Sequence, residues 1–464
     1  MARAPLDLDL DLGRRLGEVP SYGRFPSVDE QLRELQAIAD AHPGTARIAR
    51  VGSSRLGEPL LGLRIEGGPR HALVFGSPHP NEPIGCLTAL HLARTLCADG
   101  ELRRRLDLTW HVVPCADPDG MRLNEGWFDG PLTRTSFGRH FFRPAPTEQV
   151  EWTFPFAYKR AYFDRALPET VALMRLIDEV RPVLLSALHN SELGGAYYYL
   201  SGPAPALYPV LHDLAERCGI PLDLGEPEVP HAERMAPAIY RTTTSEDAYD
   251  WAERIGLDPL DRSAGASSTA YAARYGAFSI MSETPYWTHP DVADETPTEL
   301  AYADLLRERG ADLRDLGERL LAVYGDVEPD LVGGRPLAIA VREFAPSFRR
   351  IADADARRSQ EPSAQRPATV AERFSCLDNV RSFRLRYAGM LLRLLEGQVT
   401  IGNGTPAIRR HREELATTYA GWCAEAEAAT PATPLPIRDV VALQYGALLA
   451  AAAHVTSRLT SGDG

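Results

Sequence analysis

The order of hydrophobic and polar positions divides the chain into two regions. Up to about residue 296, short apolar runs at 71–76, 183–188 and 278–282 alternate with stretches of helical periodicity at 84–97 and 168–180. Runs that are apolar at nearly every position are typical of strands buried on both faces of a sheet. This alternation predicts an α/β fold, in which a mixed, mostly parallel twisted sheet is flanked by helices.

A different pattern begins after about residue 296, where strand-like runs disappear. Amphipathic helical stretches follow, separated by segments rich in Pro and Gly, at residues 300–323, 337–351, 369–395, 406–426 and 437–455. We therefore expect an N-terminal leader at 1–26, an α/β domain at 27–296 and an all-α region at 297–464. The apolar faces of these helices need a partner surface. The sequence leaves open whether they pack on each other, on the sheet or in the interface of a homo-oligomer.

Composition argues against several classes of protein. Of the 464 residues, 44% are hydrophobic and 24% charged, which is typical of a soluble globular protein. The formal net charge of −13 disfavours nucleic acid as a partner, because phosphate binding needs clustered Lys and Arg. No apolar run near either end approaches the roughly 20 residues that span a bilayer. Because the six cysteines lie far apart without a CxxC pair, we expect a cytoplasmic protein that binds no membrane.

Candidate metal ligands follow the first buried run. The segment Phe75-Gly-Ser-Pro-His79-Pro-Asn-Glu82 lies between that run and a helical stretch, and its prolines favour a turn. A turn would bring His79 and Glu82 toward one cation. The H-x-x-E spacing alone is weak evidence, because it occurs twice elsewhere in the chain. Its place between a strand and a helix is what favours a metal site.

Two further candidates stand at the ends of later runs. His189 follows one buried apolar run and Glu283 ends another, and catalytic groups of α/β proteins gather at the carboxyl ends of strands. Two His and one carboxylate leave the fourth position of a zinc ion open for water. Burial would raise the pKa of Glu283 and suit it to act as a general base. The pattern predicts one Zn²⁺ per chain, held by His79, Glu82 and His189.

Over about residues 28–290 the chain resembles the zinc carboxypeptidase family. It shares an H-x-x-E motif after a strand, a turn at Asp117-Pro-Asp-Gly120, a distal His and a catalytic Glu on a late strand, in the family's order. The resemblance implies the family's fold and a hydrolase in which zinc activates water and Glu283 takes its proton. Asp117 stands where the family has Asn.

The chain departs from the family where the substrate's terminal carboxylate is bound. The family's Asn-Arg pair is missing, and Phe142 stands before Arg143 in place of the Asn. The resemblance assigns the carboxylate contact to Arg143 and the stabilisation of an oxyanion to Arg134. It also places Ser268 and Thr269 in the pocket that selects the substrate's side chain.

Several neighbours of these motifs are expected to have other roles. The aromatic runs 150–156 and 197–199 are expected to be core or pocket wall, and Glu192 is expected at the surface. Tyr240 and Tyr249 are the nearest candidates for the tyrosine that the family uses beside its catalytic Glu.

Three functions remain compatible with the sequence. The first is a carboxypeptidase that removes a C-terminal residue from a peptide. The second is an amidase or deacylase of the same fold that acts on a small molecule or a modified peptide, which the missing Asn-Arg pair favours. The third is a non-catalytic binding protein whose helical region makes the contacts. Glu283 argues against the third, because a protein that only binds has no need of the base.

Overall fold

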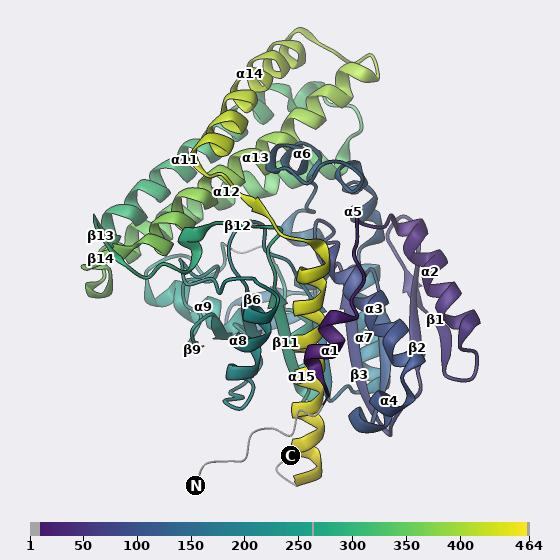
Figure 1. Ribbon diagram of the computed structural model, residues 1–464. Coiled ribbons are helices and arrows are strands. Elements are labelled where there is room, and N and C mark those ends of the chain that lie inside the picture. Colours follow the sequence, from purple (N-terminus) through teal and green to yellow (C-terminus); the bar gives the residue numbers. More distant parts are fainter. Residues whose placement is uncertain (1–9, 262–263, 462–464) are drawn as a thin grey trace.

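The chain folds around a nine-stranded mixed sheet with helices on both faces (Figure 1). The computed structural model describes residues 10–261 and 264–461. The strand order in the sheet is β1-β2-β4-β3-β7-β11-β8-β10-β9. These strands are β1 (Ala46–Ser53), β2 (Pro59–Ile65), β3 (Arg70–Gly76), β4 (Leu108–Val113), β7 (Leu184–Leu188), β8 (Tyr197–Leu200), β9 (Arg234–Ala236), β10 (Ile239–Arg241) and β11 (Phe278–Glu283).

Parallel pairs form the middle of this sheet. The neighbours β4, β3, β7 and β11 run parallel, whereas β1–β2, β2–β4, β11–β8 and β10–β9 are antiparallel pairs. Every residue of β4 and β7 is buried, because helices cover both faces of the central strands. A mixed sheet flanked by helices confirms the predicted fold class.

Two layers of helices enclose the sheet. On one face α3 packs beside α15, with α1, α2 and α8 next to them, and on the other face α7 and α10 contact the sheet. The helices of these layers, apart from α15, are α1 (Leu12–Gly17), α2 (Val28–Ala41), α3 (Ile84–Ala98), α4 (Gly100–Leu106), α7 (Pro168–Val180), α8 (Tyr208–Arg217) and α10 (Ser268–Ala272). Two more short helices, α6 (Arg134–His140) and α9 (Ser245–Arg254), lie in the connections.

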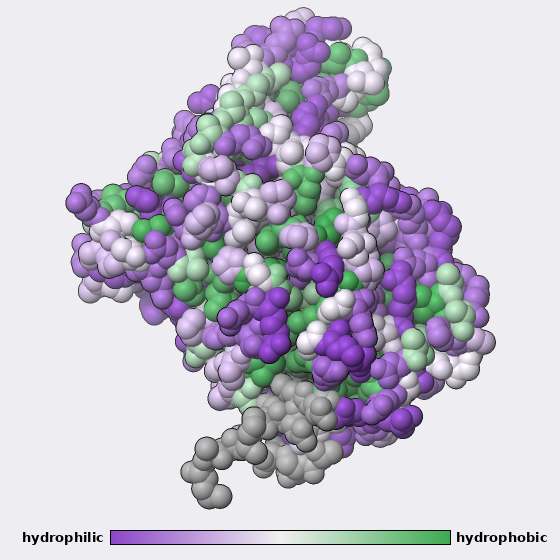
Figure 2. Space-filling model, viewed as in Figure 1, coloured by the Kyte–Doolittle hydropathy of each residue, from purple (hydrophilic) through white to green (hydrophobic). Residues whose placement is uncertain are grey.

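Four long helices form a bundle at one end of the sheet (Figure 1). They are α11 (Tyr302–Val327), α12 (Arg335–Arg358), α13 (Val370–Thr400) and α14 (Pro406–Ala429). The bundle contacts the α/β domain mainly through α13, which packs against α6. Figure 2 shows that polar side chains cover most of this face of the molecule, with apolar ones between them in small groups.

The last helix, α15 (Ile437–Ser461), corrects the predicted division of the chain. The sequence pattern predicts one helical region at 297–464, but α15 leaves the bundle and packs on α3, β7 and β11. As the chain returns, β15 (Thr433–Pro434) pairs with β12 (Trp287–Thr288). By length and composition α15 resembles a membrane span, yet 83% of its apolar window is buried inside the protein. A helix that is apolar all round is expected in a core.

The predicted leader at 1–26 is also part of the folded domain wherever the structure describes it. Residues 1–9 lie outside the described residues, whereas α1 packs against α15. Leu16 and Phe25 are buried in the main core, and buried Arg15 binds Asp99 with 2.9 Å between Nη2 and Oδ2. This segment is too short to show a helical period, so its docking does not appear in the pattern.

Candidate metal centre

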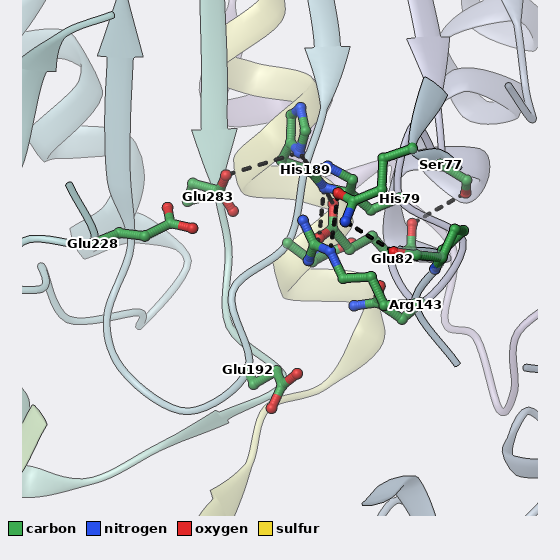
Figure 3. A network of polar contacts seen from close by, with 12 residues as sticks. Ser77, His79, Glu82, Arg143, His189, Glu192, Glu228 and Glu283 are labelled. Carbon is green, nitrogen blue, oxygen red and sulfur yellow. Dashed lines mark hydrogen bonds and ion pairs between the residues drawn. The ribbon is translucent and has the colours of Figure 1, made fainter. Parts of the chain in front are cut away.

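The loop between β3 and α3 carries two of the candidate ligands. Ser77 follows β3 with a φ of 48°, a left-handed conformation that is uncommon for residues with a side chain. Its hydroxyl donates a 3.1 Å hydrogen bond to the carbonyl of Glu82, and the Glu82 amide donates to the carbonyl of His79 at 3.1 Å. These bonds close the loop and direct the side chains of His79 and Glu82 to one point (Figure 3).

Two glycines let this loop lie close to β7. A Cβ atom on Gly76 would stand 2.4 Å from the carbonyl oxygen of Pro114 and 2.6 Å from the carbonyl carbon of Gly85. A Cβ atom on Gly85 would stand 2.8 Å from the carbonyl oxygen of Leu188. Side chains at these positions would therefore push α3 away from β7. Because glycine has no side chain, the loop can approach β7 closely. Glu82 then lies near the end of β7, where His189 begins the next loop.

The structure brings the three predicted ligands together in the interior. His79, Glu82 and His189 are 3%, 2% and 3% exposed. The Nδ1 atoms of the two histidines are 3.1 Å apart, and each lies 3.1 Å from a carboxylate oxygen of Glu82. Two imidazole nitrogens and one carboxylate oxygen that converge in this way form a donor set that suits zinc. Among the described residues these three make up the group of His, Cys, Asp and Glu side chains close enough to share a metal ion.

The electrostatics of the centre also suit a cation. Burial and the charge of Arg143 lower the pKa of His79 to about 3, so His79 is the neutral imidazole that metal binding requires. For His189, burial alone would lower the pKa, but the hydrogen bond and the charge of Glu82 raise it to about 9. A proton therefore occupies the centre when no cation does, and a metal ion would have to displace that proton.

Glu283 approaches the centre from the adjacent strand. It ends β11, is 8% exposed, and has its Oε1 3.9 Å from Nδ1 of His189. Burial holds its pKa well above the usual range, and the charges of Glu228 and Glu82 add to this effect, opposed by that of His189. In Figure 3 the side chain of Glu283 lies between the histidines and Glu228. The structure thus places a carboxylate of raised pKa beside the candidate ligands.

Arg143 is the arginine that reaches the candidate ligands. Its Nη1 lies 3.2 Å from Oε1 of Glu82, and its Nε donates to Gln149 at 3.4 Å. The backbone before it is fixed by Asn124, whose side chain donates to the Phe142 carbonyl at 2.8 Å and accepts from the Phe142 amide at 3.0 Å. The residue that replaces the family's Asn therefore serves to anchor Arg143 through its main chain.

Arg134, which the resemblance assigns to an oxyanion, contacts the helical bundle. Arg134 begins α6 and is 4% exposed. Its guanidinium binds Asp378 at 2.9 Å and the Ser382 hydroxyl at 3.1 Å, both on α13. These contacts join the bundle to the α/β domain, and among the described residues none links Arg134 to the candidate ligands. Its role at an oxyanion stays a prediction. The sequence spacing could not reveal this, since Asp378 lies 244 residues further along the chain.

The two predicted pocket residues have different surroundings. Ser268 donates from its amide and its hydroxyl to Glu151, at 3.1 and 2.9 Å, so its hydroxyl already has a partner. Thr269 is 4% exposed, and its hydroxyl makes no hydrogen bond within the described chain. The Ser268 hydroxyl therefore donates within the protein, and the roles of Ser268 and Thr269 in the pocket stay predictions.

Glu151 is a buried acid near the centre to which the sequence analysis gave no role. It is 0% exposed, and burial raises its pKa to about 7, against the opposing charge of His189. Its neighbour Trp152 stacks on His79 with 6.5 Å between ring centroids. The sequence feature that could have identified Glu151 is an acid inside the aromatic run 150–156. Burying a carboxylate in such a run costs free energy unless the carboxylate has partners.

The remaining candidates lie away from the ligands. Tyr240 on β10 packs against Tyr199 with 5.8 Å between ring centroids, and Tyr249 on α9 packs against Tyr158 at 5.5 Å. Glu192, expected at the surface, is largely buried, and its carboxylate pairs with Arg386 of α13 at 2.8 Å. Through Arg386 the bundle therefore contacts Glu192, which lies three residues after His189 in the sequence.

Comparison with known proteins finds carboxypeptidases among the similar proteins. Residues 32–217 match the family described as zinc carboxypeptidase. Carboxypeptidase Z of Mus musculus is 25% identical over 222 residues, which cover 41% of this chain and 34% of that protein. Carboxypeptidase E of Caenorhabditis elegans is 28% identical over 118 residues, which cover 23% of this chain and 25% of that protein. The chain therefore spans about a third or less of the length of these relatives.

Solved structures give a similar result at lower identity. The carboxypeptidase A of Helicoverpa armigera is 14% identical, with a TM-score of 0.37 over 76% of this chain and 79% of that one. A metallo-carboxypeptidase of Burkholderia cenocepacia is 18% identical, with a TM-score of 0.34 over 56% of this chain and 60% of that one.

Proposed function

We propose that this protein is a zinc-dependent hydrolase that removes a C-terminal residue from a peptide. Residues 32–217 match the zinc carboxypeptidase family, which supports the proposal. The observation that carries the proposal is the buried convergence of two imidazole nitrogens and the Glu82 carboxylate, with Glu283 3.9 Å from His189. A catalytic zinc site needs these three donors, an open fourth position and a base.

The side chains divide the chemistry among them. A zinc ion held by His79, Glu82 and His189 would supply Lewis acidity toward the scissile carbonyl and lower the pKa of water. Glu283 takes a proton from the attacking water and returns it to the leaving nitrogen, a role that suits a buried carboxylate whose pKa is raised. Arg143, beside Glu82, donates to the oxyanion that forms at the attacked carbonyl.

An amidase or deacylase of the same fold is the second candidate. The observation that favours it is the engagement of Arg134 by Asp378 and Ser382. Among the described residues, Arg143 is then the arginine in ion-pair contact with a candidate ligand. A carboxypeptidase would need two such groups, one to bind the terminal carboxylate and one to stabilise the oxyanion. A protein that only binds is disfavoured, because such a role gives no reason for a buried Glu283 beside the ligands.

Partners and location follow as proposals. We propose a peptide or a small amide as the substrate and a cytoplasmic location, with neither nucleic acid nor membrane as a partner. The net charge of −13 supports the first exclusion. The six cysteines are free thiols, which fits a reducing compartment.

Metal analysis and a matched substrate set test the proposal. The protein is purified without added zinc, analysed for metal, and then assayed on N-acylated dipeptides and on their C-terminal amides. We expect about one zinc per chain and release of the C-terminal residue from the free acids. Cleavage of the acyl group would support the amidase instead. Protein that binds no zinc and cleaves neither set after zinc is added would refute both candidates.

A further inference from the structure

The strands that carry His189 and Glu283 separate near their carboxyl ends. β7 and β11 pair in parallel at Leu184↔Phe278 and Leu185↔Ser279, and one isolated bridge, Asn190↔Thr284, follows beyond the strands. Between these points side chains connect the strands in place of a regular ladder; the Ser186 hydroxyl donates to the Ile280 carbonyl at 2.8 Å. Each strand is held on its outer side, β7 by β3 up to Leu188 and β11 by β8 up to Glu283. The ladder between β7 and β11 is what is interrupted below the two functional residues.

Gln444 lies on α15, which packs on β7 and β11, and its side chain spans the gap between these two strands. Its Nε2 donates to the carbonyl of His189 at 2.6 Å and to the carbonyl of Ser282 at 3.3 Å. Its Oε1 accepts from the Thr88 hydroxyl at 2.7 Å. Thr88 lies on α3, the helix that follows Glu82. One amide group thus contacts the backbone of a ligand, the backbone before the base and the helix behind another ligand.

Burial makes this arrangement specific. Gln444 is 0% exposed, within a helix whose neighbouring side chains are apolar and buried. An amide without partners would be costly there. Its NH₂ group faces two acceptors and its oxygen faces one hydroxyl donor, so a flipped amide would oppose oxygen to both carbonyls. The two carbonyls, which can only accept, therefore fix the orientation of the amide, and Thr88 satisfies its oxygen.

We propose that Gln444 is a positioning residue of the metal centre, by which the C-terminal helix sets the distance between the His189 ligand and the Glu283 base. Gln444 lies outside residues 32–217, which match the family. Its side chain bonds the carbonyls of His189 and Ser282 and the Thr88 hydroxyl. It acts through the main chain, so its loss displaces His189 and Glu283 together. The inference rests on the proposed zinc chemistry, but zinc affinity tests it without a substrate.

The test compares Gln444→Met with a matched variant in the bundle. Gln398 on α13 is 2% exposed, and its amide donates to the Val332 carbonyl at 3.0 Å and accepts from the Val332 amide at 2.9 Å. Gln398→Met removes the same kind of buried bonds far from the centre. Zinc affinity is measured by competition with a chelator, and thermal unfolding of the zinc-free protein reports stability.

We expect Gln444→Met to weaken zinc binding by roughly tenfold or more, as removal of partners behind metal ligands does, and Gln398→Met to leave it unchanged. Where hydrolysis of an N-acylated dipeptide is measurable, kcat should fall in Gln444→Met while KM changes little. Equal zinc affinity of the two variants would overturn the inference. A wild-type protein that binds no zinc would instead refute the proposed function.

Two milder variants guard against a Gln444→Met protein that does not fold. Thr88→Val removes the hydrogen bond to the amide oxygen and leaves Gln444 in place. Gln444→Glu keeps the acceptor for Thr88 and removes the NH₂ group. We expect both to weaken zinc binding, Gln444→Glu more strongly, since a carboxylate would face the carbonyls of His189 and Ser282. Unchanged affinity in both would likewise overturn the inference.

Discussion

At the scale of single residues, Glu283 is the group on which the proposed chemistry depends. Glu283→Gln keeps the shape of the side chain and removes the base, so we expect zinc content to persist and turnover to fall by roughly 10²–10⁴-fold. Glu318→Gln is the control, because Glu318 is an exposed carboxylate on α11 of the bundle. Turnover and metal content are measured for both variants. If Glu283→Gln retained most of its turnover, another group would have to be the base.

Arg143 offers a second residue-scale prediction, because its position next to Glu82 suits an oxyanion better than a distant carboxylate. We expect Arg143→Ala to lower turnover by roughly 10²–10³-fold on free-acid and amide substrates alike. Arg139→Ala, which removes a partly exposed guanidinium paired with Glu396, serves as the control. A loss confined to substrates with a free carboxylate would return Arg143 to the binding role that the family resemblance implies.

Glu151 links the centre to pH-dependent stability. Burial raises its pKa to about 7 from an ordinary value of 4.5, so the folded chain holds this proton to higher pH than the unfolded chain. The associated stability is complete below about pH 4 and is lost as the pH rises through 7, by about 3 kcal/mol. Glu151→Gln should flatten this loss in denaturant unfolding of zinc-free protein between pH 5 and 8. An unchanged slope would mean that Glu151 is ionised in the folded protein.

At the scale of elements, the contact between the β3–α3 loop and β7 decides whether the ligands meet. Gly76→Ala would place a Cβ atom 2.4 Å from the Pro114 carbonyl oxygen, so we expect a loss of about 1–3 kcal/mol in stability and weaker zinc binding. Gly325→Ala in α11, where no atom lies within 4 Å of the added Cβ, is the control. Thermal unfolding and chelator competition measure the two effects. Zinc binding that is equally tight in both variants would contradict this account.

At the scale of the whole molecule, the C-terminal helix makes the two parts of the chain inseparable. α15 buries large apolar residues in the core of the α/β domain, among them Val440, Val441, Leu443, Leu448 and Leu449. Each contributes roughly 1.5–3 kcal/mol, so together they match the whole stability of an ordinary domain, about 5–15 kcal/mol. A chain that ends at Val327 should therefore fail to fold. A soluble, zinc-binding fragment 1–327 would contradict this prediction.

The sequence by itself determined the features that depend on local pattern. Apolar runs predicted the central strands because a strand buried on both faces needs apolar residues throughout, and the ends of those strands identified His79, Glu82, His189 and Glu283 as candidates. The structure brings these four side chains together. Local pattern sufficed because strand, turn and ligand are neighbours in the chain.

Only the tertiary structure decided the features that depend on distant partners. The resemblance assigns a substrate contact to both Arg134 and Arg143, but in the fold Arg134 pairs with Asp378 on α13 and Arg143 with Glu82. Gln444 resembles any polar residue of a helix until α15 packs on β7 and β11, 255 residues beyond His189. Periodicity states how much of a helix is apolar but not which surface will cover it. The choice between bundle and sheet is therefore made by packing.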